Sequence, residues 1–211
     1  MDKITTANEA EDIFIRGCKE KSFHPETGLD TLIRLKAYET IYRSGIYWPE
    51  FDHAKALDAL VEWNNPEYIY RAGKFWNRFD TRKGLDALIS MKSARFIYYS
   101  GLEWKQFDFP KGLDALIHLQ NSEFLFYAGV HWKTFDTVKG GKALIHLKDL
   151  PFIYKAGAMW NQFDYENGWR ELERSVREGS KWRGEAFENQ KWKSALHRIW
   201  RNICTNQLQR K

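Results

Sequence analysis

The chain of 211 residues has only two cysteines, Cys18 and Cys204, which lie near opposite ends of the sequence. Small secreted domains stabilised by disulfides need several cysteine pairs, so we expect no disulfide framework here. No stretch approaches the roughly 18 apolar residues of a membrane-spanning helix, and the first residues contain no apolar run of signal-peptide length. The sequence therefore predicts a soluble protein of a reducing compartment, the cytoplasm, and a membrane partner is not expected.

Motifs of catalysis are missing as well. The sequence contains no glycine-rich phosphate loop and no GxSxG, HExxH or CxxC motif. Most acidic residues instead stand where a helix cap or an ion pair uses a carboxylate. We therefore expect a protein that is not an enzyme, with no catalytic residues, no metal site and no cofactor.

A strict period of 28 residues is the main feature that is present. A phenylalanine recurs at this interval without any insertion, and in the later copies Asp follows it directly and Trp precedes it by three residues. The phenylalanines are Phe23, Phe51, Phe79, Phe107, Phe135 and Phe163. Fixed periods of roughly 20–50 residues indicate stacked supersecondary units.

Each copy is predicted to form two short helices. The Asp caps the first helix, whose apolar residues recur at helical spacing, as Leu85, Leu88 and Ile89 do. A second cap column starts the second helix: Asn65, Ser93, Asn121 and Asp149. A glycine column is expected to end it as a left-handed C′ residue: Gly45, Gly73, Gly101, Gly129 and Gly157. The Trp and Phe are expected to fill the groove between successive helix pairs, and Gly84 belongs to a further column of small residues that permits close packing.

The sequence lacks the period-2 alternation of a strand, so the predicted fold class is all-α. Such stacked helix pairs resemble the α-solenoids of the HEAT, armadillo and tetratricopeptide class over residues 10–175, with a shorter period. The resemblance implies an α/α superhelix of about five and a half repeats. We divide the chain into a solenoid, residues 1–175, and a C-terminal capping region, residues 176–211.

The C-terminal region is basic. Residues 176–211 contain nine Lys or Arg and three acidic residues, and they account for the net charge of +5, because residues 1–175 are nearly neutral. The apolar residues of an amphipathic helix in this region are Trp192, Leu196, Ile199 and Ile203. We predict that this helix caps the last repeat.

A lysine column stands near the start of the first helices: Lys55, Lys83, Lys111 and Lys139. The positive end of the helix dipole disfavours a cation there. Two interpretations are open: a row of cations that binds nucleic-acid phosphates, or lysines paired with the aspartate three residues further on. We favour the second, with Asp58, Asp86 and Asp114 as the partners. Lys142 replaces the aspartate in the last copy, so a basic patch at Lys139 and Lys142 is predicted.

The second helices carry the columns that vary from copy to copy, where a specific surface can be encoded. Second helices usually line the concave side of such arrays, and Arg and Tyr often carry interface energy. The candidate partner-binding residues are Arg43, Arg71, Tyr99, Tyr127 and Lys155. The leading hypothesis is a non-enzymatic scaffold that binds another protein through this concave face.

Nucleic-acid binding by the basic C-terminal helix is the alternative hypothesis. Its candidate residues are Lys139, Lys142, Lys191, Lys193, Arg198 and Arg201. A third hypothesis has the tail, with Trp182, Trp192 and Trp200, docked on an anionic membrane surface. The sequence leaves the oligomeric state open.

Overall fold

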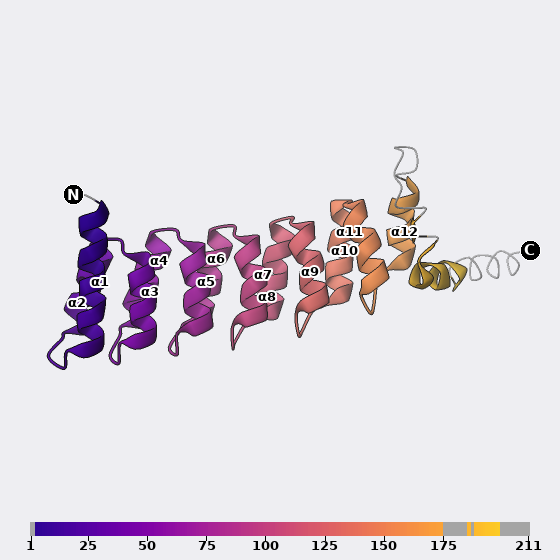
Figure 1. The fold of residues 1–211 in the computed structure, drawn as a ribbon. Coiled ribbons are helices and arrows are strands. Elements are labelled where there is room, and N and C mark those ends of the chain that lie inside the picture. Colours follow the sequence, from indigo (N-terminus) through magenta and orange to yellow (C-terminus); the bar gives the residue numbers. More distant parts are fainter. Residues whose placement is uncertain (1–2, 175–184, 187, 199–211) are drawn as a thin grey trace, which may run out of the picture. The chain divides into compact units, whose positions relative to one another are not determined.

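The computed structural model describes residues 3–174, 185–186 and 188–198, and all regular elements in them are α-helices (Figure 1). The prediction of an all-α fold is therefore confirmed for the described part of the chain. The helices belong to two compact units, Met1–Asp108 and Phe109–Lys211. Each unit is a stack of short helices joined by tight turns.

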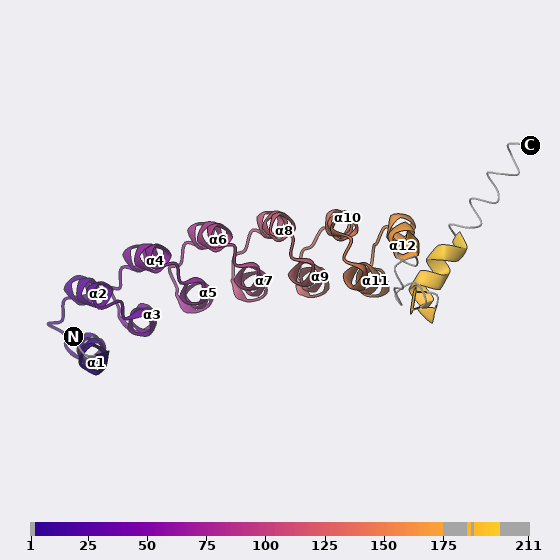
Figure 2. The same cartoon turned by 90° about the horizontal axis from the view of Figure 1, so that it is seen from above.

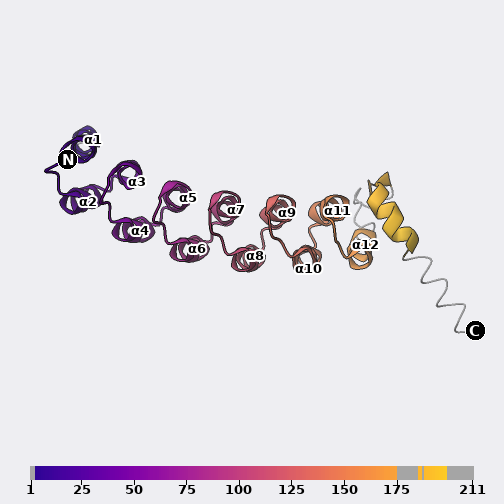
Figure 3. The same ribbon diagram turned by 90° about the horizontal axis from the view of Figure 1, so that it is seen from below.

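In its described residues, the first unit has seven helices in two layers. Figure 2 shows α2, α4 and α6 in one row and α1, α3, α5 and α7 in the other, and the view from below in Figure 3 shows the same two rows. The helices are α1 (Lys3–Lys19), α2 (Pro25–Arg34), α3 (Tyr38–Tyr47), α4 (His53–Glu62), α5 (Pro66–Phe75), α6 (Thr81–Ser90) and α7 (Ala94–Glu103). Within this unit α2, α4 and α6 are the first helices of their repeats, and α3, α5 and α7 are the second helices. The rows of this unit bend gently, with the second helices on the inner side (Figure 2).

The second unit continues the alternation of first and second helices. Its helices are α8 (Phe109–His118), α9 (Ser122–His131), α10 (Thr137–Leu147), α11 (Leu150–Met159) and α12 (Tyr165–Arg174). The second helix α9 packs against α8, α10 and α11. Residues 190–198 are also helical.

Aspartate caps start the first helices, as predicted. The Oδ1 atom of Asp52 accepts a hydrogen bond from the backbone N–H of Lys55 at 2.9 Å. Asp80 accepts one from Lys83 at the same distance of 2.9 Å. The equivalent bond is made in the second unit by Asp136 and Asp164. Each carboxylate thus satisfies one of the N–H groups that have no partner in the first turn of a helix.

The second cap column is only partly as predicted. The side chains of Asn65 and Asn121 each accept a hydrogen bond from the backbone N–H three residues further on, at 3.3 and 2.9 Å. The side chains of Ser93 and Asp149 make no capping hydrogen bond, so the prediction is wrong for these two residues. Their backbone carbonyls accept the first helical hydrogen bonds, and α7 and α11 begin without a side-chain cap.

The glycine column does not end the second helices, and this prediction is wrong. Gly45 and Gly73 lie inside α3 and α5, which continue for two residues beyond them. Among the described residues, five that are not glycine have a left-handed backbone, with φ between 53° and 56°. They lie between the first and second helices and are Lys36, Asn64, Lys92, Gln120 and Lys148. Glycine is needed for a different reason: a Cβ atom on Gly73 would lie 2.3 Å from Cε2 of Trp104. The indole ring occupies the space of a side chain.

The tryptophans interlock successive repeats, as predicted. In the first unit, Trp48, Trp76 and Trp104 are only 4–6% exposed. Each indole N–H donates to a backbone carbonyl 34 residues earlier; Trp76 donates to Tyr42 and Trp104 to Tyr70, both at 3.0 Å. A buried ring with a satisfied N–H adds both apolar burial and orientation. The stack of repeats therefore depends on one tryptophan per repeat.

Trp192 takes the same role at the end of the second unit. Its side chain is fully buried, and its Nε1 donates to the carbonyl oxygen of Tyr154 at 3.1 Å. A Cβ atom on Gly157 would lie 2.4 Å from Cζ2 of this indole, much as Trp160 lies against the glycine of α9. The helix over residues 190–198 therefore packs on α11, at the position predicted for a cap. Ile199 and Ile203 lie outside the described residues.

Candidate partner-binding surface

Twelve residues on α3, α5 and α7 form a strip that we term the second-helix face. Positions i, i+4, i+7 and i+8 lie on one side of a helix, and each of these helices contributes four of them. The residues are Glu39, Arg43, Ile46, Tyr47, Glu67, Arg71, Lys74, Phe75, Arg95, Tyr99, Leu102 and Glu103. Because α5 packs against both α3 and α7, the three sets adjoin one another. The face includes Arg43, Arg71 and Tyr99 of the predicted site.

Large apolar side chains are exposed on this face. Ile46 and Tyr47 of α3 are 39% and 63% exposed, Phe75 of α5 is 53% exposed, and Leu102 of α7 is 37% exposed. All four lie in the last turns of their helices. Scattered apolar residues are normal on a protein surface, whereas a cluster marks a contact site. None of these four residues was predicted from the sequence to belong to the site.

Ion pairs link α3 to α1 and α5 to α3, the neighbouring helices of the same row. The guanidinium of Arg43 donates to both carboxylate oxygens of Glu11 in α1, at 2.7 and 3.2 Å. Arg71 pairs with Glu39 of α3 at 3.4 Å and with Glu67 of its own helix at 2.7 Å. These side chains are half-exposed, so each pair contributes at most about 1 kcal/mol. Their geometry nevertheless fixes where the charges of the face lie.

The guanidinium groups of Arg43 and Arg71 also pack on aromatic rings. The guanidinium of Arg43 lies 4.0 Å from the ring centroid of Phe14, and that of Arg71 lies 5.2 Å from the ring of Tyr68. The hydroxyl of Tyr68 donates to Glu39 at 2.9 Å. Burial of the ring, together with this hydrogen bond, raises the pKa of Tyr68 to about 12. Arg43 and Arg71 therefore already link neighbouring repeats.

A further ion pair joins α5 to α7. The Nζ atom of Lys74 lies 3.0 Å from the carboxylate of Glu103 and 5.3 Å from the ring centroid of Phe75. The ring of Tyr99 packs 6.0 Å from that of Tyr70. Polar and aromatic contacts thus connect these two helices beside the exposed apolar residues.

The pattern of charges changes at α7. The position held by Glu67 in α5 is held by Arg95 in α7, and the position of Arg71 is held by Tyr99. The guanidinium of Arg95 lies 5.6 Å from the ring centroid of Phe96 and 5.7 Å from that of Tyr99. Within the described part of the chain, no carboxylate pairs with Arg95. The third helix of the face therefore carries a cation where the earlier helices carry an acid.

Two of the predicted partner-binding residues lie in the second unit. Tyr127 is half-buried in α9, with its ring stacked at 6.1 Å on that of His131. Lys155 lies in α11, and its Nζ atom is 4.8 Å from the ring centroid of Phe152. The other three predicted residues, Arg43, Arg71 and Tyr99, lie on the second-helix face of the first unit.

The lysine column is paired differently from the prediction. Each described pair joins a lysine to the aspartate of the preceding first helix: Lys55 with Asp30 at 2.6 Å, Lys83 with Asp58, and Lys139 with Asp114. The predicted pairing within one helix is therefore wrong for Lys55 and Lys83. Because first helices stack side by side, the aspartate of the neighbouring helix lies within reach of Nζ. Lys139 was expected to lack an acidic partner and has one.

The other candidates for nucleic-acid binding have varied environments. Lys191 donates from Nζ to the backbone carbonyls of Met159 and Trp160, at 3.4 and 3.3 Å, at the C-terminal end of α11. A cation at that position also complements the helix dipole. All five described candidates, Lys139, Lys142, Lys191, Lys193 and Arg198, are exposed. Outside the described residues lie Arg201 and the tail tryptophans Trp182 and Trp200.

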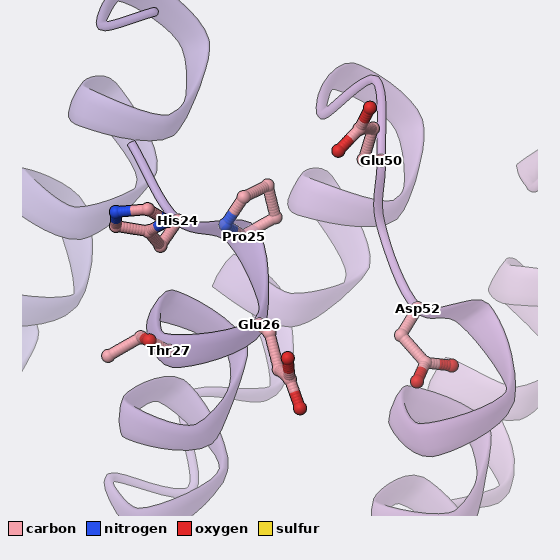
Figure 4. Close-up of a pocket in the computed structure, with 6 residues that line it drawn as sticks. All are labelled: His24, Pro25, Glu26, Thr27, Glu50 and Asp52. Carbon is pink, nitrogen blue, oxygen red and sulfur yellow. The ribbon is translucent and has the colours of Figure 1, made fainter. Parts of the chain in front are cut away.

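A shallow pocket of about 510 Å³ lies between the starts of α2 and α4 (Figure 4). It is lined by His24, Pro25, Glu26, Thr27, Glu50 and Asp52. Figure 4 shows its three carboxylates directed apart rather than toward one point. Asp52 is already used as the cap of α4. In the described residues, no group of three or more His, Cys, Asp or Glu side chains is placed to hold a metal ion.

Other features of the described chain add no further site. The thiol of Cys18 is free and exposed, and Cys204 lies outside the described residues. None of the described helices combines the length and apolar character needed to cross a membrane. Comparisons of the chain with protein-family models, with curated proteins and with solved structures gave no match.

Proposed function

We propose that the protein is a non-enzymatic scaffold that binds another protein through the second-helix face. The observation that carries the proposal is the exposure of Ile46, Tyr47, Phe75 and Leu102 on consecutive second helices. Exposed apolar area costs about 25 cal/mol per Å² in water, and a partner that covers it recovers this free energy. The stacking of repeats uses other columns, those of the buried tryptophans and glycines.

The charged residues of the face suit a protein partner. Most of them form ion pairs beside the apolar residues, and such a polar border around an apolar centre is typical of protein interfaces. A polyanion would instead be bound by several unpaired cations that neutralise phosphates. Tyr and Arg, present at Tyr99 and Arg95, are frequent hot-spot residues in protein interfaces.

The experiment that tests this proposal removes the apolar residues without disturbing the stack. A triple variant, Ile46→Ser, Phe75→Ser and Leu102→Ser, is compared with a control variant at an exposed apolar position of a first helix, Val138→Ser in α10. Partners captured from the source cells are identified, purified and titrated against each variant by calorimetry. We expect the triple variant to bind at least tenfold more weakly and the control variant to bind like wild type, with unchanged circular dichroism spectra. Equal affinity of the triple variant and wild type would reject this face.

Nucleic-acid binding by the C-terminal region is supported by the exposure of Lys142, Lys193 and Arg198. It is the weaker candidate because Lys139 and Lys191 already have partners within the chain. Its test is the salt dependence of binding to duplex DNA, since the logarithm of the affinity falls linearly with the logarithm of salt concentration. A flat dependence, or no loss of affinity on exchanging Lys142, Lys193 and Arg198 for Gln, would argue against it.

A further inference from the structure

One charged residue of the second-helix face differs from all the others. Six of its charged residues take part in ion pairs: Glu39, Arg43, Glu67, Arg71, Lys74 and Glu103. Arg95 is the seventh, and among the described residues it has no carboxylate partner. The charges of these six residues sum to zero, and Arg95 adds one positive charge to the face at the start of α7.

The guanidinium of Arg95 is exposed and oriented. It lies over the rings of Phe96 and Tyr99, at 5.6 and 5.7 Å from their centroids. Such contacts restrict the arginine side chain while leaving its N–H donors free for an anion. A planar guanidinium matches a carboxylate with two parallel hydrogen bonds, so an acidic side chain is a fitting ligand.

Apolar residues lie at a defined distance from this cation. Leu102 follows Arg95 by seven residues on α7, which corresponds to about 10 Å along the helix axis. Tyr99 stands between them on the same side of α7, and Phe75 is exposed at the equivalent end of the neighbouring helix α5. The sequence of chemical groups along α7 is thus a cation, an aromatic ring and an exposed aliphatic side chain.

We propose that the second-helix face binds a protein segment that presents a carboxylate to Arg95 and, about 10 Å away, an apolar side chain to Leu102 and Phe75. This inference rests on the proposed function and names the chemistry of its partner. The charge reversal from Glu67 to Arg95 at equivalent positions supports it, because Glu39 and Glu67 hold an acid at this position on the two earlier helices of the face. A single unpaired cation beside aliphatic groups favours an acidic protein segment over a nucleic-acid backbone.

The test is a selection of binding peptides on the full chain. A displayed library of random 16-residue peptides is selected on wild type and on the variants Arg95→Gln and Arg95→Glu. The variant Arg82→Gln is the matched control, because Arg82 is an exposed cation on the first helix α6. Selected peptides are titrated by fluorescence anisotropy against these proteins and against a Phe75→Ser, Leu102→Ser variant. A single-stranded oligonucleotide and the concentration dependence of the chain's own mass serve as further probes.

We expect wild type to select peptides with an acidic and an apolar residue at a fixed spacing. A spacing of about seven residues indicates a helical peptide and about three an extended one. Arg95→Gln should weaken their binding about fivefold, Arg95→Glu should select Lys or Arg at the same position, and Arg82→Gln should change nothing.

Other outcomes overturn the inference and separate it from the proposed function. Peptides that need Phe75 and Leu102 but respond equally to every variant of Arg95 would reject the acidic partner and retain the scaffold. Failure to obtain any peptide that depends on Phe75 and Leu102 would reject both. Binding of the oligonucleotide that is lost in Arg95→Gln would assign the cation to a polyanion. A dimer of the chain that Arg95→Glu abolishes would make a second copy the occupant.

Discussion

Replacement of Gly73 by Ala tests the interlock between tryptophan and glycine. In the middle of an unobstructed helix this change stabilises by up to about 1 kcal/mol, because Ala has the higher helix propensity. In α5, however, the new Cβ would lie 2.3 Å from Cε2 and 2.4 Å from Nε1 of Trp104, and 2.8 Å from Cε1 of Phe79. Forcing extra atoms into a packed site costs about 1–3 kcal/mol. We expect Gly73→Ala to lower the free energy of unfolding by about 2 kcal/mol.

The chain offers a matched control in α10. A Cβ atom on Gly141 would lie 3.5 Å from its nearest neighbour, a ring atom of Phe163, which is an ordinary contact. Gly141→Ala should therefore keep the propensity gain and stabilise by up to about 1 kcal/mol. Urea unfolding followed by far-UV circular dichroism measures both changes, and the two substitutions should move the midpoint in opposite directions.

A second substitution distinguishes crowding from backbone strain. Trp104→Leu removes the indole atoms nearest to Gly73 but leaves Cε1 of Phe79 at 2.8 Å, so the penalty of Gly73→Ala should become smaller in that background. If glycine were needed for a left-handed backbone, the penalty would be the same whatever residue occupied position 104. A penalty that Trp104→Leu leaves unchanged, or a Gly73→Ala variant as stable as wild type, would refute the explanation by close packing.

Three further outcomes are expected. Lys92→Gly should raise the free energy of unfolding by up to about 1 kcal/mol, because Lys92 holds a left-handed φ of 53°. Asn64→Gly should change the free energy of unfolding little, since Asn tolerates that conformation. Urea unfolding measures both changes. Trp192→Ala should cost about 3–5 kcal/mol in the same assay because a fully buried ring is removed from the C-terminal cap. The pKa of Tyr68 is raised from 10.0 to about 12, so the folded state favours the protonated phenol. The contribution of Tyr68 to the free energy of unfolding is therefore fully present below pH 10.0 and is lost as the pH rises through about 12. The thermal midpoint of wild type should fall more steeply over that range than that of Tyr68→Phe.

The helical stack was predictable because its copies can be compared with one another within one sequence. The aspartate caps act locally: the carboxylate of Asp80 meets an N–H only three residues away. The tryptophans were recognisable because a large apolar residue kept in each copy after the first is best explained by burial. Local and repeated signals therefore sufficed for the fold class.

The errors concern contacts between repeats. A glycine near a helix end suits both a left-handed C′ position and close packing, and only the ring of Trp104, 31 residues after Gly73, decides between them. Lys83 had an acidic residue three positions away in its own helix, but the stacking of first helices brings Asp58 within reach instead. Spacing along one helix cannot show which neighbour lies beside it.

The candidate site was predicted only in part. Arg43, Arg71 and Tyr99 were identified from their variation between copies, and they share one face in the first unit. The exposed Phe75 and Leu102 were missed, although they lie four and three residues after the variable positions of their own helices and so share the same side. Sequence variation identifies a position, whereas exposure depends on how much of the side chain the neighbouring helix covers.

The 28-residue register lets the stack lose a whole repeat while the second-helix face changes. Deletion of residues 65–92 would join Asn64 to Ser93 and remove the helix pair α5 and α6, together with Trp76, Gly73 and Gly84. Trp104 would then face Gly45, which now receives the ring of Trp76, so the packing of the stack would be restored at the new junction. The second-helix face would change abruptly, because Arg71, Lys74 and Phe75 would be lost and α3 would adjoin α7. Whole-repeat loss or duplication can therefore change the residues of the second-helix face in one genetic step, with the packing between repeats kept.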